Sequence, residues 1–482
     1  MTAQKGYIIV DIGTGNVRVA LASVTGEVLN IERDNVHYIK DEKYLEAQYF
    51  DPDELWSQIK VLTQKVLQNV PGFQVKAITA SSQREGIVLL GKNGEALIGL
   101  PNHDHRGRQW ESIIEDKSRV YELTGRYPSS LFSAMKLVGV RERHPEMWEQ
   151  LTTFTSISDW AQYKLCGVLG YEHSQASETL LYDIEQKKWS DELCTIFGID
   201  KNILPALHSS GSISEIILPE FAAQFNIALD AVIIVGGADT QLAIKSTQPS
   251  LEDVVIVSGT TTPITKVIDE YTIDKKERTW TNRHTDKDKF ILEANAGVTG
   301  LNYQRLKEIF YPNESYEVIE SEIASTDILH SQCIASLGSS IADEKSPLTK
   351  GAFIFNAPVS HLLKRADFVY ATLWDIACSI KENYNTLCDV SSHTTDYVWV
   401  CGGGLQSATL RQFVANLINK KVRICEGFQH ASVVGGALIC NETLGEKETA
   451  SVTLEETNSR DMDYSDSLYD QWKSARAALR KI

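Results

Sequence analysis

The sequence lacks the features that would point to a membrane, secreted or nucleic-acid-binding protein. No apolar run approaches the length of a membrane-spanning helix, and the first residues enter a strand-like run without the pattern of a signal peptide. The formal net charge of −17 excludes an extended cationic surface, although it leaves room for a local basic pocket. We therefore expect a cytoplasmic protein without a membrane or nucleic-acid partner.

The cysteines show neither a disulfide framework nor a zinc motif. All eight are scattered, none forms a Cys-x-x-Cys pair, and several lie in apolar runs. In a chain of 482 residues this pattern favours reduced, structural thiols, as a cytoplasmic location would require.

What the sequence does contain is the composition of a globular protein with more than one core. Hydrophobic residues make up 43% and charged residues 23% of the chain, and the length exceeds what one core usually supports. Segments typical of strands and helices alternate, which indicates an α/β architecture. A short polar segment follows Thr247, so we expect two domains, residues 1–247 and 248–482.

Local signals assign elements in both halves. Asp51 can cap a helix in which Pro52 takes the first position, and Ser158 is expected to cap another. The first half reads as strands in 7–34, a helix from 52, a strand at 76–81, a hairpin at 87–99, mostly helix over 106–202, and a strand, glycine turn and helix at 231–244. The second half reads as strands in 254–268, an extended run at 290–297, helices at 299–310, 368–387 and 408–419, a strand at 397–401, a loosely held polar tail at 448–466 and a last helix.

Two segments half a chain apart repeat one pattern. Residues 8–20 read IIVDIGTGNVRVA and residues 254–267 read VVIVSGTTTPITKV, each an apolar β-branched run, a tight Gly/Thr turn and a second β-rich run. Small loops with glycine let backbone N–H groups approach an anion closely, and threonine hydroxyls add donors. If duplicated domains bring these loops face to face, the pair suits a polyphosphate held from both sides.

These hairpins, the turn GGADTQ and the segment CGGGLQSATLRQFVANLINKKV resemble the FGGY family of carbohydrate kinases, and the similarity runs from Tyr7 to about Asn441. Within the family, SSQREGIVLL, PNHDHRGRQ and TFTSISDWAQYKLCG look most like the autoinducer-2 kinase subgroup. The resemblance implies two duplicated ribonuclease-H-like, actin-like ATPase domains with a catalytic cleft between them. A homodimer is expected by analogy alone.

The resemblance implies an ATP- and Mg²⁺-dependent kinase that phosphorylates a hydroxyl of a small sugar, ketose or polyol-like compound. A pentulokinase of the xylulokinase or ribulokinase type, a glycerol kinase-like enzyme and a weakly catalytic sensor are the alternatives. By the same resemblance, the N-terminal domain holds the sugar and the catalytic base, and the C-terminal domain holds the nucleotide.

Asp11 ends the first strand and is expected to hold Mg²⁺ through water, since Mg²⁺ prefers oxygen ligands and keeps several waters. The alternative is a carboxylate that only stabilises a tight turn. Arg18 could meet the transferring phosphoryl group, or it could be a solvent-facing residue of an edge strand. The residues expected near the phosphates are Thr14, Gly15, Asn16, Arg18, Gly259, Thr260 and Thr261.

By resemblance, Asp239 is the catalytic base that accepts the proton of the attacking hydroxyl, and it also faces the metal. Without the family, Asp239 is equally well an N-cap residue. The expected substrate contacts are Gln83, Arg84, Glu85, Asp104, Asp159 and Thr240, with Gln241 as a minor one, and Asp159 could instead be a first-turn acid of its helix. The expected contacts of adenine and ribose are Gly297, Gly403, Gly404 and Ser407.

Three departures from the family pattern bear on specificity. Leu131 stands where many relatives carry an aromatic hydroxyl, and Asn416 replaces the usual Asp of its helix. The segment APVSHLLKRADF lacks the Gly-Glu-Arg loop that relatives insert before the long helix. We expect the loss of this loop to alter substrate choice, with altered activity as the alternative.

Overall fold

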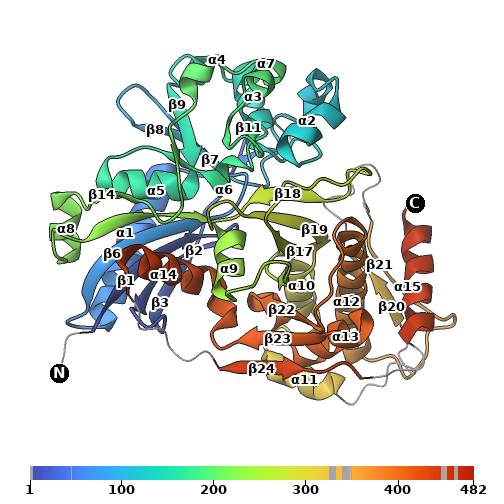
Figure 1. Cartoon of the computed structure of the whole chain (residues 1–482). Coiled ribbons are helices and arrows are strands. Elements are labelled where there is room, and N and C mark those ends of the chain that lie inside the picture. Colours follow the sequence, from blue (N-terminus) through green and yellow to red (C-terminus); the bar gives the residue numbers. More distant parts are fainter. Residues whose placement is uncertain are drawn as a thin grey trace.

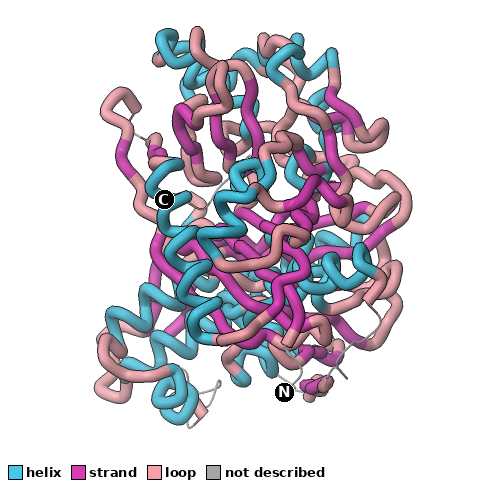
Figure 2. The backbone as a smooth tube through the Cα atoms, turned by 90° about the vertical axis from the view of Figure 1, so that its left-hand side faces the viewer, coloured by secondary structure: helices cyan, strands magenta, loops and turns pink. Residues whose placement is uncertain are grey.

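The computed structural model describes residues 4–44, 46–324, 333–338, 348, 350–446, 453–460 and 465–481. Two large sheets form its body, one from each half of the chain, and a region rich in helices and loops covers one end of the first sheet (Figure 1). In the view turned by 90°, strands gather in the middle of the molecule with helices on either side (Figure 2). The α/β class predicted from the sequence is confirmed.

The first sheet has the strand order β14-β15-β6-β1-β2-β3. Its strands are β1 (Lys5–Ile12), β2 (Asn16–Ser23), β3 (Val28–Asn35), β6 (Gln74–Ser82), β14 (Ile213–Ile216) and β15 (Val232–Ala238). β1, β2 and β3 are antiparallel neighbours, β6 and β15 run parallel to β1, and β14 closes the edge antiparallel to β15. Alternate residues of β1 enter two different apolar clusters, Ile8 and Val10 in one and Tyr7 and Ile9 in the other, so both faces of the sheet are covered.

The second sheet has the order β18-β19-β17-β16-β22-β23-β24 and repeats the connections of the first. Its strands are β16 (Val254–Val257), β17 (Thr261–Ile268), β18 (Trp280–Arg283), β19 (Phe290–Val298), β22 (Tyr397–Cys401), β23 (Lys421–Cys425) and β24 (Leu454–Thr457). β16, β17 and β19 form the antiparallel meander, β22 and β23 run parallel to β16, and β24 closes the edge antiparallel to β23. β18 is an additional strand beyond β19. The duplication expected from the twin hairpins is therefore present in the strand order.

Helices repeat with the strands. The helices that take part in this repeat are α1 (Pro52–Asn69), α5 (Ile157–Cys166), α9 (Asp239–Ser246), α12 (Arg365–Val390), α13 (Ala408–Ile418) and α14 (Ala431–Leu444). α1 precedes β6 as α12 precedes β22, and α9 follows β15 as α14 follows β23. α9 and α14 pack against each other in the middle of the molecule (Figure 1), and a Cβ at Gly435 would overlap the backbone of Leu242. The two halves are thus joined by equivalent helices.

Most of the remaining elements lie between β6 and β14 or around α12. In the first half they are β4 (Ile39–Lys40), β5 (Gln48–Tyr49), β7 (Ile87–Leu90), β8 (Ala96–Leu100), the 3-10 helix Arg108–Ile113, α2 (Lys117–Thr124), α3 (Ser133–Arg143), α4 (Pro145–Trp148), β9 (Thr153–Ser156), β10 (Tyr171–Glu172), α6 (His173–Ala176), β11 (Tyr182–Asp183), β12 (Lys188–Trp189), α7 (Asp191–Phe197), the 3-10 helix Lys201–Ile203, β13 (Leu207–His208) and α8 (Pro219–Phe225). In the second half they are α10 (Gly300–Phe310), α11 (Tyr316–Ile323), β20 (Cys333–Ser336), β21 (Ala352–Phe355), the 3-10 helices Gly403–Leu405 and Phe428–His430, and α15 (Ser465–Leu479).

Three local predictions were wrong. Ser156, not Ser158, caps α5, because its hydroxyl accepts the N–H of Asp159. The glycines of GGAD form no turn, since they lie inside β15 and α9 begins directly after it. Part of the polar tail is strand β24, which pairs with β23, while 447–452 and 461–464 lie outside the described residues. Within the described ranges, no helix is both long enough and apolar enough to span a bilayer.

Candidate active site

The carboxyl ends of the three parallel strands of the first sheet bring the predicted charged residues to one edge. Asp11 on β1 lies opposite Ser81 on β6, and Ser81 lies opposite Gly237 on β15. Arg84 follows the end of β6 by two residues, and Asp239 follows β15 directly. In open α/β sheets, ligands bind outside the carboxyl ends of the parallel strands. The fold therefore gathers Asp11, Arg84 and Asp239 where a ligand is expected.

Asp11 is buried, and its carboxylate is held by three side chains. Oδ1 accepts a hydrogen bond from Ser81 Oγ at 2.7 Å, and Oδ2 accepts one from Ser432 Oγ at 2.9 Å. The guanidinium of Arg18, directly across the β1–β2 ladder, donates from Nε at 3.0 Å and also from Nη2. Arg18 is thus an ion-pair partner of Asp11 rather than a solvent-facing residue of an edge strand. Sequence patterns missed Ser432 because it comes from α14, more than 400 residues away.

Asp239 is the first residue of α9, and Ala238 is the N-cap, so the N-cap alternative for Asp239 is wrong. Its Oδ1 accepts hydrogen bonds from the backbone N–H of Thr240 at 2.6 Å and from Thr240 Oγ1 at 3.3 Å. Burial raises the pKa of Asp239 to about 6, the negative charge of Asp11 adds to the rise, and Arg84 opposes it. A carboxyl group with a pKa near neutrality is suited to accept a proton from a hydroxyl.

Arg84 is bound by the second half of the chain. Its Nη1 and Nη2 donate to the two carboxylate oxygens of Glu293 on β19, at 2.5 and 3.0 Å. Glu293 also accepts hydrogen bonds from Asn282 and Asn295, and the charge of Arg84 holds the pKa of this buried carboxyl below its usual range. This two-fold grip fixes the guanidinium plane of Arg84 beside Asp239.

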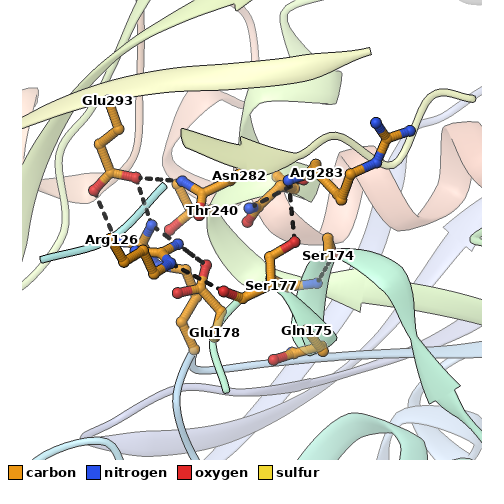
Figure 3. Close-up of polar contacts among 12 residues, drawn as sticks. Arg126, Ser174, Gln175, Ser177, Glu178, Thr240, Asn282, Arg283 and Glu293 are labelled. Carbon is orange, nitrogen blue, oxygen red and sulfur yellow. Dashed lines mark hydrogen bonds and ion pairs between the residues drawn. The ribbon is translucent and has the colours of Figure 1, made fainter. Parts of the chain in front are cut away.

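A second buried pair lies next to this one (Figure 3). Arg126 Nη2 is 2.5 Å from Glu178 Oε1, its Nε donates to the carbonyl of Ser177, and its guanidinium lies 4.8 Å from the ring of Trp280. Glu178 is 3.9 Å from Arg84, and burial raises the pKa of the Glu178 carboxyl while both arginines oppose the rise. Sequence reasoning missed these pairs, although a glutamate inside the apolar strand FILEANAG was a signal that could have found Glu293.

Glu85 carries a carboxylate that no described residue binds. The residue is 6% exposed, and its φ of 61° lies in the left-handed region, which non-glycine residues at functional sites adopt at a cost of roughly 1–3 kcal/mol. Nearby, the ammonium of the buried Lys136 donates to the carbonyls of Asn102 and Leu131. Burial lowers the pKa of Lys136 to about 8, although the charges of Asp104 and Glu85 favour its protonated form.

Gln83 lies where predicted, but it holds the first hairpin rather than reaching outward. Its Oε1 accepts the N–H of Asn102 at 2.9 Å, and its Nε2 donates to the carbonyl of Gly13. Asn102 Nδ2 in turn donates to Thr14 Oγ1 at 2.9 Å. A Cβ at Gly15 would meet no atom within 4 Å, so the tip of this hairpin is open to a ligand. Asn16 begins β2 and pairs with Asn35.

Two predicted substrate contacts are engaged inside the protein. Asp104 accepts hydrogen bonds from Arg106 Nε at 2.7 Å and from the N–H of Gln48, and its side chain is fully buried. Asp159 accepts hydrogen bonds from Ser156 Oγ at 2.6 Å and from the N–H of Glu172 at 2.9 Å, and burial raises its pKa to about 6. The structure does not bring either carboxylate to Asp239 by a direct contact, and their role toward substrate stays a prediction.

The second hairpin converges with two other glycine-containing turns. A Cβ at Gly300 would overlap the carbonyl of Gly259, and a Cβ at Gly404 would overlap Ser258 Oγ, whereas one at Gly259 would meet nearly empty space. The hydroxyls of Ser258, Thr262 and Thr299 form a chain, with 3.0 and 2.7 Å between successive oxygens. The turns after β16, β19 and β22 are therefore packed so closely that only glycine fits at the junctions.

The other predicted nucleotide residues lie on these turns or in the strands and helix that flank them. Thr260 accepts hydrogen bonds from the N–H groups of Thr299 and Leu301, and Thr261 begins β17. Gly297 has a φ of 77° and Gly403 begins a short 3-10 helix. Ser407 caps α13 because its hydroxyl accepts the N–H of Leu410, and the O–H of Ser407 can still donate to a ligand.

The donor set fits the expected Mg²⁺ and ATP. No cluster of three or more metal-binding side chains occurs among the residues that the structure describes, but Mg²⁺ needs only one or two carboxylates when it keeps its waters. Asp11 and Asp239 are close enough for their charges to interact. Because protein donors occupy Asp11, its expected approach to the metal is through water. The glycine turns supply backbone where a polyphosphate would lie.

The departures from the family pattern have structural places. Leu131 contributes its carbonyl to Lys136. Asn416 Oδ1 accepts hydrogen bonds from Gln412 Nε2 and from the N–H of Arg460, each at 2.8 Å, and so ties α13 to the tail.

Two surface cavities of about 270 and 580 Å³ lie away from this site, the first beside Trp189 and the second beside Tyr49.

Comparison with protein-family models identifies both halves. The N-terminal domain model of the FGGY family of carbohydrate kinases matches residues 6–245, and the C-terminal domain model matches residues 334–443. A protein of Bacillus subtilis (strain 168) named "Putative sugar kinase YoaC" is 49% identical over 476 residues, covering 99% of this chain and 98% of its own. The autoinducer-2 kinase of Salmonella paratyphi A is 26% identical over 249 residues, which are 50% of this chain and 47% of its own.

Solved structures match over almost the whole chain. The xylulose kinase of Lactobacillus acidophilus has a TM-score of 0.86 at 18% identity and covers 98% of each chain. The gluconate kinase of the same organism has a TM-score of 0.84 at 18% identity, covering 99% of this chain and 98% of its own. The glycerol kinase of Plasmodium falciparum with ADP has a TM-score of 0.82 at 18% identity and covers 98% of each chain. At these identities the likeness shows the fold, which is the two-domain fold expected from the sequence.

Proposed function

This chain belongs to the FGGY family of carbohydrate kinases and is an ATP-dependent sugar kinase, and we propose that it transfers the γ-phosphoryl group to a hydroxyl of a small ketose or polyol with Asp239 as the base. One observation carries the assignment: Asp11, Arg84 and Asp239 meet at the carboxyl edge of the first sheet. The autoinducer-2 kinases match only half of the chain, so a substrate of the autoinducer-2 type is one member of the panel below rather than the leading choice.

Asp239 accepts the proton of the attacking hydroxyl. Phosphoryl transfer places most of its demand on positioning and on charge stabilisation, so an oriented carboxylate suffices as the acceptor. Thr240 orients Oδ1 of Asp239 through two hydrogen bonds, and burial keeps the pKa of the carboxyl near neutrality. ATP supplies the phosphoryl group, and Mg²⁺ would neutralise charge that develops on it.

Asp11 and Arg18 are assigned to the phosphate side. Asp11 would hold Mg²⁺ through water, and Arg18, whose side chain is 26% exposed and paired with Asp11, has further N–H donors that would stabilise charge on the transferring group. Thr14, Gly15 and Asn16 on one hairpin, and Gly259, Thr260 and Thr261 on the other, contact phosphates. Gly297, Gly403, Gly404 and Ser407 line the nucleoside side. This division corresponds to domains 1–247 and 248–482, and we expect the enzyme in the cytoplasm, as a homodimer by analogy.

Coupled measurement of ADP release tests the function. Tetroses, pentuloses, hexuloses, their polyols, glycerol and the autoinducer-2 precursor are offered with Mg-ATP to the wild type, to Asp239→Asn and to Asp191→Asn. Asp191 is the matched control, because it is also a first-turn aspartate but is exposed on α7. We expect sugar-dependent turnover that Asp239→Asn reduces by roughly 10²–10⁴-fold. Silence across the panel, with nucleotide still bound, would contradict the proposal.

A further inference from the structure

The positive charge of Arg84, beside Asp239, is already neutralised by the protein. Both terminal nitrogens of Arg84 are taken by Glu293, and Arg126 is paired with Glu178. The four side chains are between 0% and 8% exposed. In the doubly hydrogen-bonded pair of Arg84 and Glu293 the two charges balance each other, and removing one member would leave an uncompensated charge. The guanidinium of Arg84 therefore presents no free positive charge to a ligand.

Glu85 and Asp239 at this edge have no cation at ion-pair distance among the described residues. The carboxylate of Glu85 has no hydrogen-bond or ion-pair partner among the described residues, although the backbone carbonyl of Glu85 accepts from Ser133 Oγ, and Asp239 accepts only from Thr240. Lys136 lies nearby, but its ammonium donates to backbone carbonyls and its charge faces Asp104 and Glu85. A ligand that binds here meets carboxylates that can accept its hydroxyl protons.

One buried arginine of the region has no carboxylate within ion-pair distance among the described residues, but it is directed elsewhere. The guanidinium of Arg283 lies 4.3 Å from the ring centre of Phe290, and burial lowers its pKa. Figure 3 shows this side chain extending away from Glu178 and Thr240. Its charge is therefore not presented toward Asp239.

Resting on the kinase function proposed above, we propose that the substrate is an uncharged polyhydroxy compound, that sugar acids are rejected, and that Glu293 is the residue that sets this choice. The solved neighbours include a xylulose kinase, a glycerol kinase and a gluconate kinase, so the fold alone does not select the charge of the substrate.

Glu293 sets the choice between neutral and acidic substrates because it balances the charge of Arg84 but leaves some of its N–H donors free. With its positive charge balanced, the guanidinium still has N–H groups beyond the two bonds to Glu293, and these can donate to a hydroxyl oxygen. The same hydroxyl can donate to Glu85. A carboxylate of a sugar acid would have to displace Glu293 from Arg84 or lie beside the carboxylate of Glu85. Two negative charges in contact repel each other strongly.

The test compares ligands of equal chain length that differ in charge. ADP release by the wild type is measured with D-xylulose, xylitol and D-fructose against D-xylonate and D-gluconate, and again with Glu293→Gln. We expect the wild type to favour its best neutral substrate by at least about 100-fold in kcat/KM. Glu293→Gln, which keeps the shape but frees the charge of Arg84, should lower kcat/KM for the neutral substrate and shrink that preference at least about tenfold.

Asp286→Asn is the matched control. Asp286 pairs with Lys245 at 2.7 Å, so this change also removes an ion pair between the halves, but it does not touch Arg84. It should keep the wild-type preference. A wild type that prefers the acid, or an unchanged preference in Glu293→Gln, would overturn the inference while the kinase function stands. If Glu293→Gln does not fold, the wild-type preference tests whether the substrate is uncharged, and Glu178→Gln tests whether a carboxyl group beside Arg84 sets that preference. No ADP release with either class would instead refute the proposed function.

Discussion

The two sheets share one topology but carry opposite chemistry at equivalent positions. Asp11 lies opposite Ser81 where the first sheet's meander strand meets its parallel neighbour, and the equivalent pair in the second sheet is Val257 and Cys401. Three residues beyond Ser81 the chain carries Arg84, and three residues beyond Cys401 it carries Gly404. The first edge thus presents partnered charges, whereas the second presents backbone.

A duplicated fold can thus divide one reaction between its two halves. Charged side chains need neighbours that hold them, and Asp11 is held from β2, β6 and α14. Glycine turns need only close packing, and the packing around Ser258 supplies it. Proton transfer and charge stabilisation require the first kind of edge, while a long polyphosphate and a planar base require the second. Substitutions at equivalent positions of the two sheets should therefore impair different properties, catalysis in the first sheet and stability or nucleotide binding in the second.

Among the changes that compare the two sheets, Asp11→Asn should give the largest effect. The change removes the counter-charge of Arg18 and the carboxylate that faces the metal, so kcat should fall by roughly 10²–10³-fold. Nucleotide affinity, measured with a fluorescent ATP analogue, should change far less. Val257→Asn at the equivalent position of the second sheet is the comparison, and its defect should be one of stability, since Val257 is 8% exposed in an apolar cluster. A kcat defect of equal size in both variants would contradict the division of the reaction between the edges of the two sheets.

Gly404→Ala should act mainly on the nucleotide. A Cβ there overlaps Ser258 Oγ, and overpacking of this kind costs about 1–3 kcal/mol, so the free energy of unfolding should fall and the KM for ATP should rise roughly tenfold. Gly15→Ala in the first hairpin is the matched variant. Its Cβ meets open space, so unfolding should change by less than about 0.5 kcal/mol while phosphate binding weakens. Urea unfolding beside ATP titration separates the two effects.

The dependence of kcat/KM on pH should show a moderate effect, which comes from Asp239 at the edge of the first sheet. Asp239 must be ionised to act as a base, and its pKa is raised to about 6, so kcat/KM for the sugar should fall about tenfold per pH unit below that value. Because the charge of Asp11 contributes to the rise, the residual activity of Asp11→Asn should show this limb at lower pH. The pKa of Asp159 is also raised to about 6, so circular dichroism across the same range must show that the fold persists.

Patterns local in sequence predicted the strands, the long helices and the charged residues at strand ends, because alternation and tight turns are set within a few residues. Asp11, Arg84 and Asp239 were found in this way, with the family resemblance supplying their roles. The sequence could not predict which residues these charged side chains would bind. Glu293 and Ser432 reach the first sheet's edge from the second half, and only the folded arrangement of β19 and α14 brings them there. Ser158 failed as a cap because Ser156, two residues earlier, competes for the same role.

Ser432→Ala should give the smallest effect and measure how much the second half contributes to Asp11. Ser432 Oγ donates to Asp11 at 2.9 Å and accepts from Arg18 Nη2 at 3.2 Å. Losing such a bond costs about 1 kcal/mol, so kcat/KM should fall about fivefold.

Ser391→Ala is the control for this change, because Ser391 also accepts from a cation, Lys266, at 2.7 Å but lies far along the chain from the first edge. It should lose similar stability without losing activity. Since Ser432 belongs to α14, unchanged kcat/KM in Ser432→Ala would mean that Ser81 and Arg18 alone position Asp11. The second half would then act on the reaction only through Glu293 and the nucleotide.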